Sequence, residues 1–223
     1  QVVFHDRLPR KAAQYAPRDG KERIGSLAAR MGVESLYSHQ YEAISRIRKH
    51  RHVVVATPTA SGKTLIYNLP VIERILKDPS ARALYLFPLK ALAQDQLRTF
   101  VEINSVLGGS CPTGAIYDGD TTAWRRKKIR ENPPNVIMTN PEMLHLTFLA
   151  HHEKWGGFIS GLKFVVIDEV HTYRGILGSH MAQVLRRFRR ICMDYGADPV
   201  FVFSSATIGN PADLSSSLTG LEV

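Results

Sequence analysis

Short apolar runs recur along the chain and predict strands that are buried inside a domain. Several are unbroken runs of Val, Ile, Leu and Phe rather than alternating ones, which is the pattern of strands covered on both faces. The predicted strands are His52–Ala56, Ala83–Phe87, Thr113–Tyr117, Asn135–Met138, Phe164–Ile167 and Val200–Ser204.

Helical patterns lie between these runs, and the clearest are Gly62–Leu76, Leu89–Ile103, Thr122–Arg130 and Ser179–Tyr195. Alternating strands and helices imply right-handed crossovers and a mostly parallel sheet flanked by helices, so the predicted fold class is α/β. We expect residues 1–34 to form a helical lead-in and residues 35–223 to form one α/β domain. In such sheets ligands bind at the carboxyl ends of the strands, which directs attention to the residues that follow each strand.

The charge balance narrows the class of partner. The chain has 29 Lys and Arg against 20 Asp and Glu, a formal net charge of +9 and a pI near 9.7. Excess positive charge favours an anionic partner, and nucleic acid is the commonest one. A solvated basic face with no partner is the alternative. An apolar content of 44% is ordinary for a chain of 223 residues that buries a core.

Other compositional features exclude several classes of protein. The two cysteines, Cys111 and Cys192, are too few for a disulfide framework or a four-cysteine zinc site, and we expect both to be reduced. No run approaches about 20 apolar residues, so no transmembrane helix is expected, and the amino terminus lacks a signal-peptide pattern. We therefore expect a cytoplasmic protein. Because the chain begins at Gln1 without Met, we expect it to be a fragment of a longer protein.

The residues after the first predicted strand suit a phosphate group. Residues 57–64 read Thr-Pro-Thr-Ala-Ser-Gly-Lys-Thr, a small polar turn that leads into a helix. Such a turn exposes backbone N–H groups, and the helix directs the positive end of its dipole at an anion. Lys63 is predicted to reach the β- and γ-phosphates of a triphosphate, and the Thr64 hydroxyl to bind Mg²⁺. Thr57 stands where the usual pattern has Gly. The other predicted ATP contacts of the turn are Thr59, Ala60, Ser61 and Gly62.

Two adjacent acids end the predicted strand Phe164–Ile167. Asp168 and Glu169 are costly to place there without a cation. Mg²⁺ is the economical partner, with Asp168 holding the ion opposite Thr64 and Glu169 orienting or deprotonating the water that attacks the γ-phosphate. Taken alone, such a pair is more often a helix cap or a surface pair. The phosphate loop upstream favours the catalytic interpretation.

Three motifs resemble motifs I, II and III of superfamily 2 helicases, in the same order: Gly62-Lys63-Thr64, Asp168-Glu169-Val170-His171 and Ser205-Ala206-Thr207. The chain resembles the first of the two RecA-like motor domains of that family over nearly all of residues 35–220. The resemblance implies a RecA-like P-loop NTPase fold and ATP and Mg²⁺ as cofactors. It also implies a second RecA-like domain of the same polypeptide as a partner.

Three further segments after predicted strands imply contacts with a nucleic-acid backbone. Phe87–Gln96 is similar to motif Ia, Thr139–Leu144 to motif Ib, and Tyr117–Thr121 to the segment between them. Lysine, hydroxyl and helix-start amide groups at these places suit backbone phosphates, which position a strand without reading its sequence. Thr139 or Thr121 would otherwise simply cap a helix. The residues predicted to contact nucleic acid here are Pro88, Lys90, Gly119, Asp120, Thr121, Thr139, Asn140 and Glu142.

The same resemblance gives roles to four other residues. The hydroxyls of Ser205 and Thr207 would couple the acidic site to the bound strand. His171, the remaining predicted catalytic residue, would contact the γ-phosphate or the second motor domain, and a structural histidine is the alternative. Gln40 would pair with adenine N6 and N7, with Tyr37 packed beside the base. Taken alone, Gln40 is an ordinary helix residue.

Basic residues form two clusters on predicted helices, at 125–128 and at 186–190. A solvated helix face is the first interpretation, and salt-sensitive attraction of nucleic acid is the second. Residues 171–180, together with 56–61, look like the mitomycin repair factor A branch, which is related to fungal RecQ4-like helicases. Members of that branch are 3′-to-5′ DNA helicases. Arg174 is predicted from its position to reach the bound strand.

The function implied by the resemblance is an ATP-dependent 3′-to-5′ DNA helicase or translocase that acts in DNA repair and tracks single-stranded DNA. An RNA helicase is the first alternative, because the Asp-Glu-Val-His box serves both substrate classes. A nucleotide-switched nucleic-acid-binding module without strand movement is the second. Because the second motor domain and its arginines are outside this chain, we expect the isolated fragment to bind ATP weakly and to be largely inactive.

Overall fold

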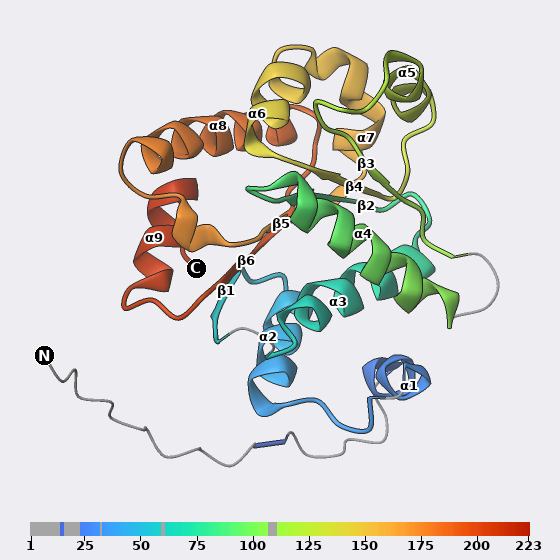
Figure 1. Cartoon of the computed structure of the whole chain (residues 1–223), viewed down its shortest axis with the longest axis vertical. Coiled ribbons are helices and arrows are strands. Elements are labelled where there is room, and N and C mark those ends of the chain that lie inside the picture. Colours follow the sequence, from blue (N-terminus) through green and yellow to red (C-terminus); the bar gives the residue numbers. More distant parts are fainter. Residues whose placement is uncertain (1–13, 16–22, 32, 59–60, 107–110) are drawn as a thin grey trace, which may run out of the picture.

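A single parallel sheet contains all the named strands of the described part of the chain (Figure 1). The computed structural model describes residues 14–15, 23–31, 33–58, 61–106 and 111–223. The strand order is β1-β6-β5-β2-β4-β3, and every neighbouring pair is parallel. The strands are β1 (Val53–Ala56), β2 (Arg82–Leu86), β3 (Gly114–Ile116), β4 (Val136–Thr139), β5 (Leu162–Ile167) and β6 (Val200–Ser205).

Every strand prediction is confirmed, with ends that differ by two residues or fewer. The four central strands, β2, β4, β5 and β6, are buried almost throughout. The edge strands β1 and β3 are only partly buried. Because central strands of such a sheet have no solvent-facing side, their sequences are apolar without alternation. The predicted fold class, an α/β domain with a parallel sheet, is confirmed as well.

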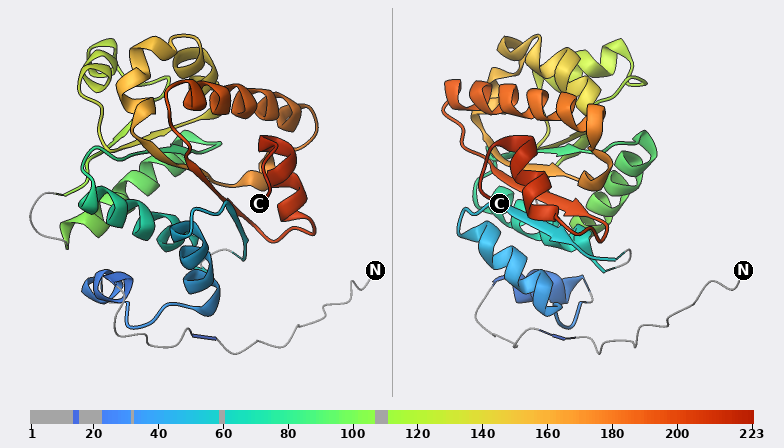
Figure 2. Two further views of the ribbon diagram at one scale, coloured as in Figure 1. Left: turned by 180° about the vertical axis from the view of Figure 1, so that it is seen from behind. Right: turned by 90° about the vertical axis from the view of Figure 1, so that its left-hand side faces the viewer.

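Helices cover both faces of the sheet, as Figure 2 shows from two further sides. Helices α1 to α4 pack on sheet residues such as Tyr85 and Val166 to form one core. Helices α5 to α9 pack on the opposite face, against residues such as Leu84 and Val165. Successive strand residues belong to different cores because their side chains point to opposite faces. The helices are α1 (Arg23–Arg30), α2 (Ser38–Arg48), α3 (Lys63–Lys77), α4 (Lys90–Ser105), α5 (Ala123–Glu131), α6 (Pro141–Met143), the π-helix η1 (Leu144–Leu149), the 3-10 helix η2 (His152–Trp155), α7 (Gly156–Ser160), the 3-10 helix η3 (Val170–Thr172), α8 (Gly175–Asp194) and α9 (Pro211–Thr219).

Helix α8 begins earlier than the predicted start at Ser179. Its first residue, Gly175, has a left-handed backbone with φ of 56°. At Gly178 the chain passes close to the preceding loop, and a Cβ atom there would lie 2.6 Å from the Tyr173 carbonyl oxygen. Glycine weakens a helical pattern in the sequence, yet here the two glycines allow the helix to begin directly after the acidic segment.

The predicted helical lead-in over residues 1–34 is helical at α1 but not throughout. Tyr15 forms an antiparallel bridge with Tyr37, and the Ser38 N–H donates to the Gln14 carbonyl at 2.9 Å. The chain is therefore extended at residues 14–15, where it runs alongside the residues before α2. Residues 1–13 and 16–22 lie outside the described residues.

The structure also bears on the cysteines and on possible membrane spans. Cys111 is half-buried, Cys192 is buried, and neither forms a disulfide in the described part of the chain. In the described parts of the chain, no helix combines the length and the apolar character that crossing a membrane requires.

Candidate functional site

The loops after the strands meet at one edge of the sheet, because all the strands run in the same direction. Main-chain hydrogen bonds join these loops to neighbouring strands. The Thr57 N–H donates to the Ser205 carbonyl at 3.3 Å, and the Asp168 N–H donates to the Leu86 carbonyl at 3.0 Å. The predicted phosphate loop (residues 57–64), the acidic pair and the Ser-Ala-Thr segment therefore share one edge.

Lys63 connects two of these segments. Its ammonium donates to the Thr57 carbonyl at 2.8 Å, to the Ser205 carbonyl at 3.1 Å and to the Pro58 carbonyl at 3.5 Å. The cation is thus held by neutral oxygens at the first residue of α3. Phosphate oxygens form stronger, charge-assisted hydrogen bonds with the same group, so a bound triphosphate can take the place of the carbonyls.

The phosphate loop is closed by contacts within it and by Gln40. The Thr57 and Ser61 hydroxyl oxygens are 2.6 Å apart. Gly62 has a left-handed backbone with φ of 74°, and a Cβ atom there would lie 2.3 Å from Gln40 Nε2. This position therefore requires glycine. The predicted ATP contacts Thr59 and Ala60 lie outside the described residues.

Gln40 bonds the phosphate loop in this conformation, and its pairing with adenine stays a prediction. The residue is 2% exposed, and its amide nitrogen donates to the carbonyls of Ser61 at 3.4 Å and Gly62 at 3.1 Å. Its amide oxygen accepts the Tyr37 N–H at 2.9 Å, which caps α2. Both amide donors are in use, so Gln40 holds the phosphate loop instead of presenting a free edge to adenine. Pairing with adenine would require the amide to leave the loop.

Tyr37 belongs to an aromatic stack that the sequence did not predict. Its ring lies 5.2 Å from the ring of Tyr15 and 5.7 Å from that of His39, measured between centroids. Both contacts are stacked. The ring predicted to pack beside a base is therefore held in place by its neighbours at the start of α2.

Thr64 is positioned by Gln96 and Tyr67, two residues that have no role in the sequence-based prediction. Gln96 of α4 donates to the Thr64 hydroxyl at 3.5 Å and accepts a hydrogen bond from the Tyr67 hydroxyl at 2.9 Å. Burial raises the pKa of Tyr67 far above its ordinary value, so its hydroxyl stays protonated and remains a donor. Because Gln96 lies in the segment similar to motif Ia, these bonds tie that segment to the phosphate loop.

Asp168 is a buried carboxylate with well-defined partners. It is 7% exposed, and its Oδ1 accepts hydrogen bonds from the Ser204 hydroxyl and, at 2.9 Å, from the Glu169 N–H. Burial raises the pKa of Asp168 to about 6, while the charge of Lys63 lowers it. A buried carboxylate at the same sheet edge as the phosphate loop is a suitable ligand for a hard divalent cation such as Mg²⁺. Ser204 carried no functional signal in the sequence, where it was only the end of a strand.

Glu169 and His171 link the acidic pair to the Ser-Ala-Thr segment. Glu169 has φ of 52°, a left-handed conformation that is uncommon for residues other than glycine. Its Oε2 lies 3.2 Å from His171 Nδ1, and the same nitrogen lies 3.3 Å from the Ala206 N–H. A protonated Nδ1 can donate to Glu169, whereas an unprotonated one can accept from Ala206. Whether Nδ1 carries a hydrogen therefore decides which of the two neighbours it can bond.

The hydroxyls of Ser205 and Thr207, the predicted coupling residues, form no hydrogen bond among the residues that the structure describes. Ser205 is fully buried, and its hydroxyl lacks a hydrogen-bond partner within the described residues. Thr207 is exposed. The contacts from this segment use its main chain instead, through the Ser205 carbonyl on Lys63 and the Ala206 N–H near His171. The roles of the two hydroxyls stay predictions.

Lys90 and Asp120, both predicted to contact nucleic acid, contact each other. The Lys90 ammonium lies 2.8 Å from the Asp120 carboxylate, and this hydrogen bond raises the pKa of Lys90. The ion pair joins the start of α4, which follows the half-buried Pro88, to the turn after β3. Both side chains are exposed, so a phosphate would compete with Asp120 for the ammonium.

The turn after β3 is built around Asp118, which the sequence-based prediction overlooked. Its buried Oδ1 accepts the Asp120 and Thr121 N–H groups, each at 3.0 Å, and the Thr121 hydroxyl at 2.9 Å. Gly119 remains exposed at the tip of the turn. Aspartate followed by small polar residues is a recognised turn signal, so this role was accessible from the sequence.

The segment similar to motif Ib is more buried than expected. Thr139 is 1% exposed and donates its hydroxyl to the Tyr117 carbonyl at 2.5 Å. The Asn140 side chain accepts the Met143 N–H at 2.8 Å and caps the short helix α6. Glu142 is exposed. In this conformation the Thr139 hydroxyl joins β4 to the residue that follows β3, and its contact with a backbone phosphate stays a prediction.

Arg174 is exposed immediately before α8, at the same edge of the sheet as the acidic pair. It lines a cavity of about 390 Å³ between α8 and α9, together with Tyr173 and Asn210. Its predicted contact with a bound strand stays a prediction.

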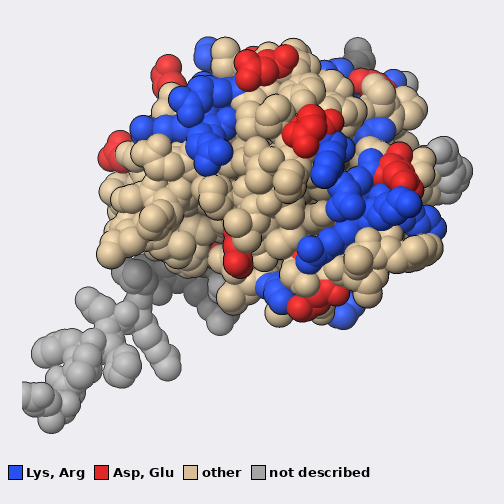
Figure 3. Space-filling model, turned by 90° about the horizontal axis from the view of Figure 1, so that it is seen from above, with Lys and Arg blue, Asp and Glu red and all other residues tan. Residues whose placement is uncertain are grey.

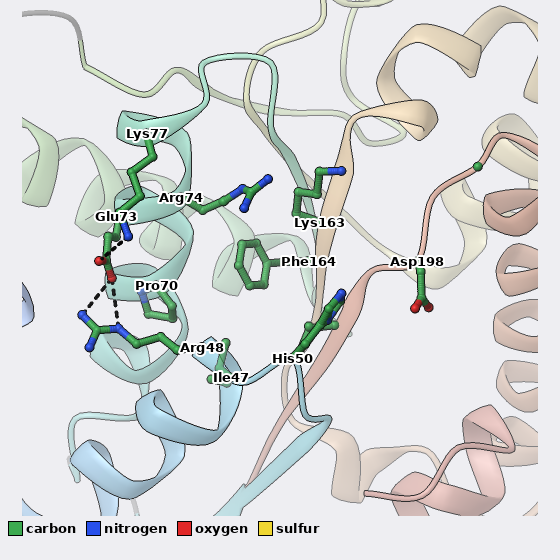
Figure 4. Close-up of a pocket in the computed structure, with 12 residues that line it drawn as sticks. Ile47, Arg48, His50, Pro70, Glu73, Arg74, Lys77, Lys163, Phe164 and Asp198 are labelled. Carbon is green, nitrogen blue, oxygen red and sulfur yellow. Dashed lines mark hydrogen bonds and ion pairs between the residues drawn. The ribbon is translucent and has the colours of Figure 1, made fainter.

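A larger cavity, of about 730 Å³, lies at the opposite end of the sheet (Figure 4). Phe164 lies among its lining, with Arg74 and Lys163 nearby, while Glu73 forms ion pairs with Arg48 and Lys77, each at 3.0 Å. This cavity faces the amino ends of β5 and β6. We therefore locate the candidate site by the convergence of the strand-end loops and not by cavity size.

Known proteins are similar to this chain over most of its length. The DEAD/DEAH box helicase family model matches residues 37–214. Over 220 residues the chain is 49% identical to the uncharacterized ATP-dependent helicase YprA of Bacillus subtilis, a match that covers 98% of this chain and 29% of YprA.

Two solved structures add to this comparison. The crystal structure of the DUF1998 helicase MrfA bound to DNA and AMPPNP matches with a TM-score of 0.89 at 48% identity, over 94% of this chain and 30% of that one. The DEAD-box helicase Mss116 bound to ssRNA and UDP-BeF matches with a TM-score of 0.73 over 89% of this chain and 41% of that one. At 16% identity, the likeness to Mss116 shows the fold alone. The chain spans less than a third of the length of YprA and of the MrfA chain.

Proposed function

The chain belongs to the DEAD/DEAH box helicase family, and from that premise we propose that it is the first RecA-like motor domain of an ATP-dependent 3′-to-5′ DNA helicase or translocase. The observation that carries the proposal is the convergence of three segments at one sheet edge. Lys63 of the phosphate loop bonds the Ser205 carbonyl across 142 residues, and Asp168 accepts from Ser204 of the same strand. The ATPase site and the strand-coupling segment are thus one connected structure.

The side chains present fit a magnesium nucleotide. Lys63 would exchange its carbonyl partners for β- and γ-phosphate oxygens, while Thr64 and Asp168 would hold Mg²⁺. The buried Asp168 carboxyl, with its raised pKa, supports this assignment because a divalent cation offsets the cost of its charge. Bound Mg²⁺ neutralises charge on the phosphates during transfer.

Glu169 is the residue that we assign to the attacking water. Its strained backbone holds the carboxylate beside His171, and strained conformations of this kind persist where the surroundings enforce them. His171 would transmit the state of this site to the Ser-Ala-Thr segment by exchanging Glu169 for the Ala206 N–H. A second RecA-like domain of the same polypeptide would supply the groups that complete hydrolysis.

DNA is the nucleic acid that the relatives favour. MrfA, at 48% identity, has been solved with DNA, whereas the RNA-bound Mss116 shares only the fold. The exposed turns around Lys90 and Gly119 offer sequence-independent phosphate contacts on this domain. The role in DNA repair rests on the resemblance of residues 171–180 and 56–61 to the mitomycin repair factor A branch.

The substitution Glu169→Gln tests the ATPase assignment in the full-length protein that contains this chain. We expect the steady-state hydrolysis rate to fall by at least about 100-fold, because the amide cannot act as a base. Nucleotide affinity, measured by calorimetry, should stay within about threefold, since Glu169 binds neither the phosphates nor the metal. Glu102→Gln, an exposed change on α4, is the matched control. Unchanged hydrolysis in the Glu169 variant would refute the assignment.

A further inference from the structure

The basic residues of α5 divide into two groups with different surroundings. Arg126 donates to the carbonyls of Asp118 at 2.7 Å and Gly119 at 3.0 Å and lies over the Tyr117 ring at 5.7 Å. Arg130 donates to the Tyr117 hydroxyl at 3.0 Å. These two arginines stabilise the turn after β3, so their guanidinium groups already have partners within the domain.

The other basic residues of α5 face solvent around an exposed tryptophan. Trp124, in the first turn of the helix, is 71% exposed, and the Lys128 ammonium lies 5.3 Å from its ring centroid. Lys127 lies 3.7 Å from Glu131. The exposed Arg125 side chain makes no hydrogen bond or ion pair with the residues that the structure describes. Seen from above, Lys and Arg side chains form a band on the side of the molecule where α5 lies (Figure 3).

An exposed indole is unusual enough to require a reason. Trp155, the other tryptophan of the chain, is 2% exposed and packs among aromatic rings. Leaving an indole in water forgoes the stabilisation that burial of its large apolar surface provides. Trp124 lies in the first turn of α5, which Thr122 caps by accepting a main-chain N–H. This turn of helix comes directly after the turn of Gly119 and Asp120, which we propose to contact a nucleic-acid backbone.

We propose that Trp124 is a stacking platform for a nucleobase, with Arg125, Lys127 and Lys128 attracting the phosphates on either side of it. An aromatic ring among cations matches single-stranded nucleic acid, which offers a flat base and two flanking phosphates at each nucleotide. Stacking of this kind tolerates any base, so the contact adds affinity without adding sequence preference. The inference rests on the proposed function, since it extends the track from the Gly119 turn onto α5.

The two tryptophans allow a direct optical test on this chain. Binding of a 15-nucleotide oligo(dT), followed by anisotropy of a labelled oligonucleotide, should quench the tryptophan fluorescence. An abasic oligomer of the same length keeps the phosphates but lacks bases, and it should bind more weakly and without quenching. The conservative variant Trp124→Phe should keep most of the affinity for oligo(dT) and lose the quenching, because only the buried Trp155 then fluoresces.

Removal of the ring separates stacking from charge. Trp124→Ala should weaken oligo(dT) binding roughly 5- to 150-fold, the range measured for loss of one stacked base, and leave abasic binding unchanged. Met193→Ala, which removes a 68% exposed side chain at the far end of α8, should change neither. The inference would be overturned if Trp124→Ala bound oligo(dT) as tightly as the wild type does, and if oligo(dT) did not quench the fluorescence of the wild type. Nucleic-acid binding itself would then be intact. Failure of the wild-type chain to bind either oligomer would instead refute the nucleic-acid function, and the inference with it.

Discussion

At the scale of one residue, Asp168 lowers the free energy of unfolding because it buries the charge that the proposed metal site uses. Burial raises its pKa from the ordinary 3.8 to about 6. Below about pH 4 the carboxyl is protonated in the folded and unfolded chains alike, so it contributes no difference. Between about pH 4 and pH 6 the unfolded chain ionises this carboxyl in water, whereas the folded chain would have to bury the charge. The free energy of unfolding therefore falls across this pH range, by up to about 3 kcal/mol.

Asp168→Asn should accordingly stabilise the nucleotide-free chain by about 1–3 kcal/mol at pH 7, because the amide keeps an acceptor for Ser204 without burying a charge. Urea unfolding at pH 7 and pH 4 measures the effect, and the gain should shrink at the lower pH. Asp95→Asn changes an exposed carboxylate and should stay within about 0.5 kcal/mol of wild type. Equal stability of the Asp168 variant and the wild type at pH 7 would contradict the explanation.

Single residues also show where sequence reasoning stops. The location of Lys63, Asp168 and Glu169 at one sheet edge could be predicted, because all three follow strands of a parallel sheet, while their chemistry stays a prediction. The sequence also placed Gln40 at the start of a helix and Thr139 after a strand, but it did not predict their hydrogen-bond partners. Apart from a nearby main-chain N–H on Gln40, those partners come from residues 21 or more positions away, so they depend on the packing of the whole edge.

At the scale of elements, α8 and α9 are joined by arginines from the second basic cluster. Arg186 donates to the Ser217 carbonyl at 2.8 Å, and Arg189 donates to the Thr219 carbonyl at 2.7 Å. The last carbonyls of a helix lack partners within the helix, so these bonds satisfy the end of α9 and favour its negative dipole end. Arg186 remains exposed, as the interpretation of this cluster as a solvated face expects, whereas Arg189 is half-buried and its charge is used in this contact.

Arg189→Ala should lower the free energy of unfolding by about 1–3 kcal/mol, because it removes a charge-assisted bond and leaves a carbonyl of α9 unpaired. Arg190→Ala, an exposed change in the same cluster, should lie within about 0.5 kcal/mol of wild type. Thermal or urea unfolding of the two variants provides the comparison. Equal losses would mean that the cluster acts through its total charge and not through the bond to α9.

Helices and strands were predicted most reliably where burial on both faces permits only apolar residues. The central strands are apolar without interruption because both their faces are covered, and their limits could be read closely. The start of α8 was missed because Gly175 and Gly178 resemble a loop. The structure shows that Gly175 has a left-handed backbone and that Gly178 lies close to the Tyr173 carbonyl. The π-helix η1 had no distinguishing pattern in the sequence.

For the whole molecule, the parallel sheet places the two proposed binding functions on one side. The loops that we propose to bind nucleotide and nucleic acid all follow strands, so they share an edge, while the 730 Å³ cavity lies at the other end. The net charge of +9 is consistent with an anionic partner, and part of it is used within the domain by arginines such as Arg126 and Arg189. Because the chain covers less than a third of its relatives, the activity of the whole protein is a proposal that needs a direct measurement.

The most direct measurement is steady-state ATP hydrolysis by the full-length protein that contains this chain, with no nucleic acid, with single-stranded DNA and with RNA of the same length. The proposed motor predicts slow basal hydrolysis that DNA stimulates severalfold and RNA does not. Hydrolysis stimulated by RNA alone would identify an RNA helicase, and hydrolysis indifferent to both would contradict a nucleic-acid motor altogether.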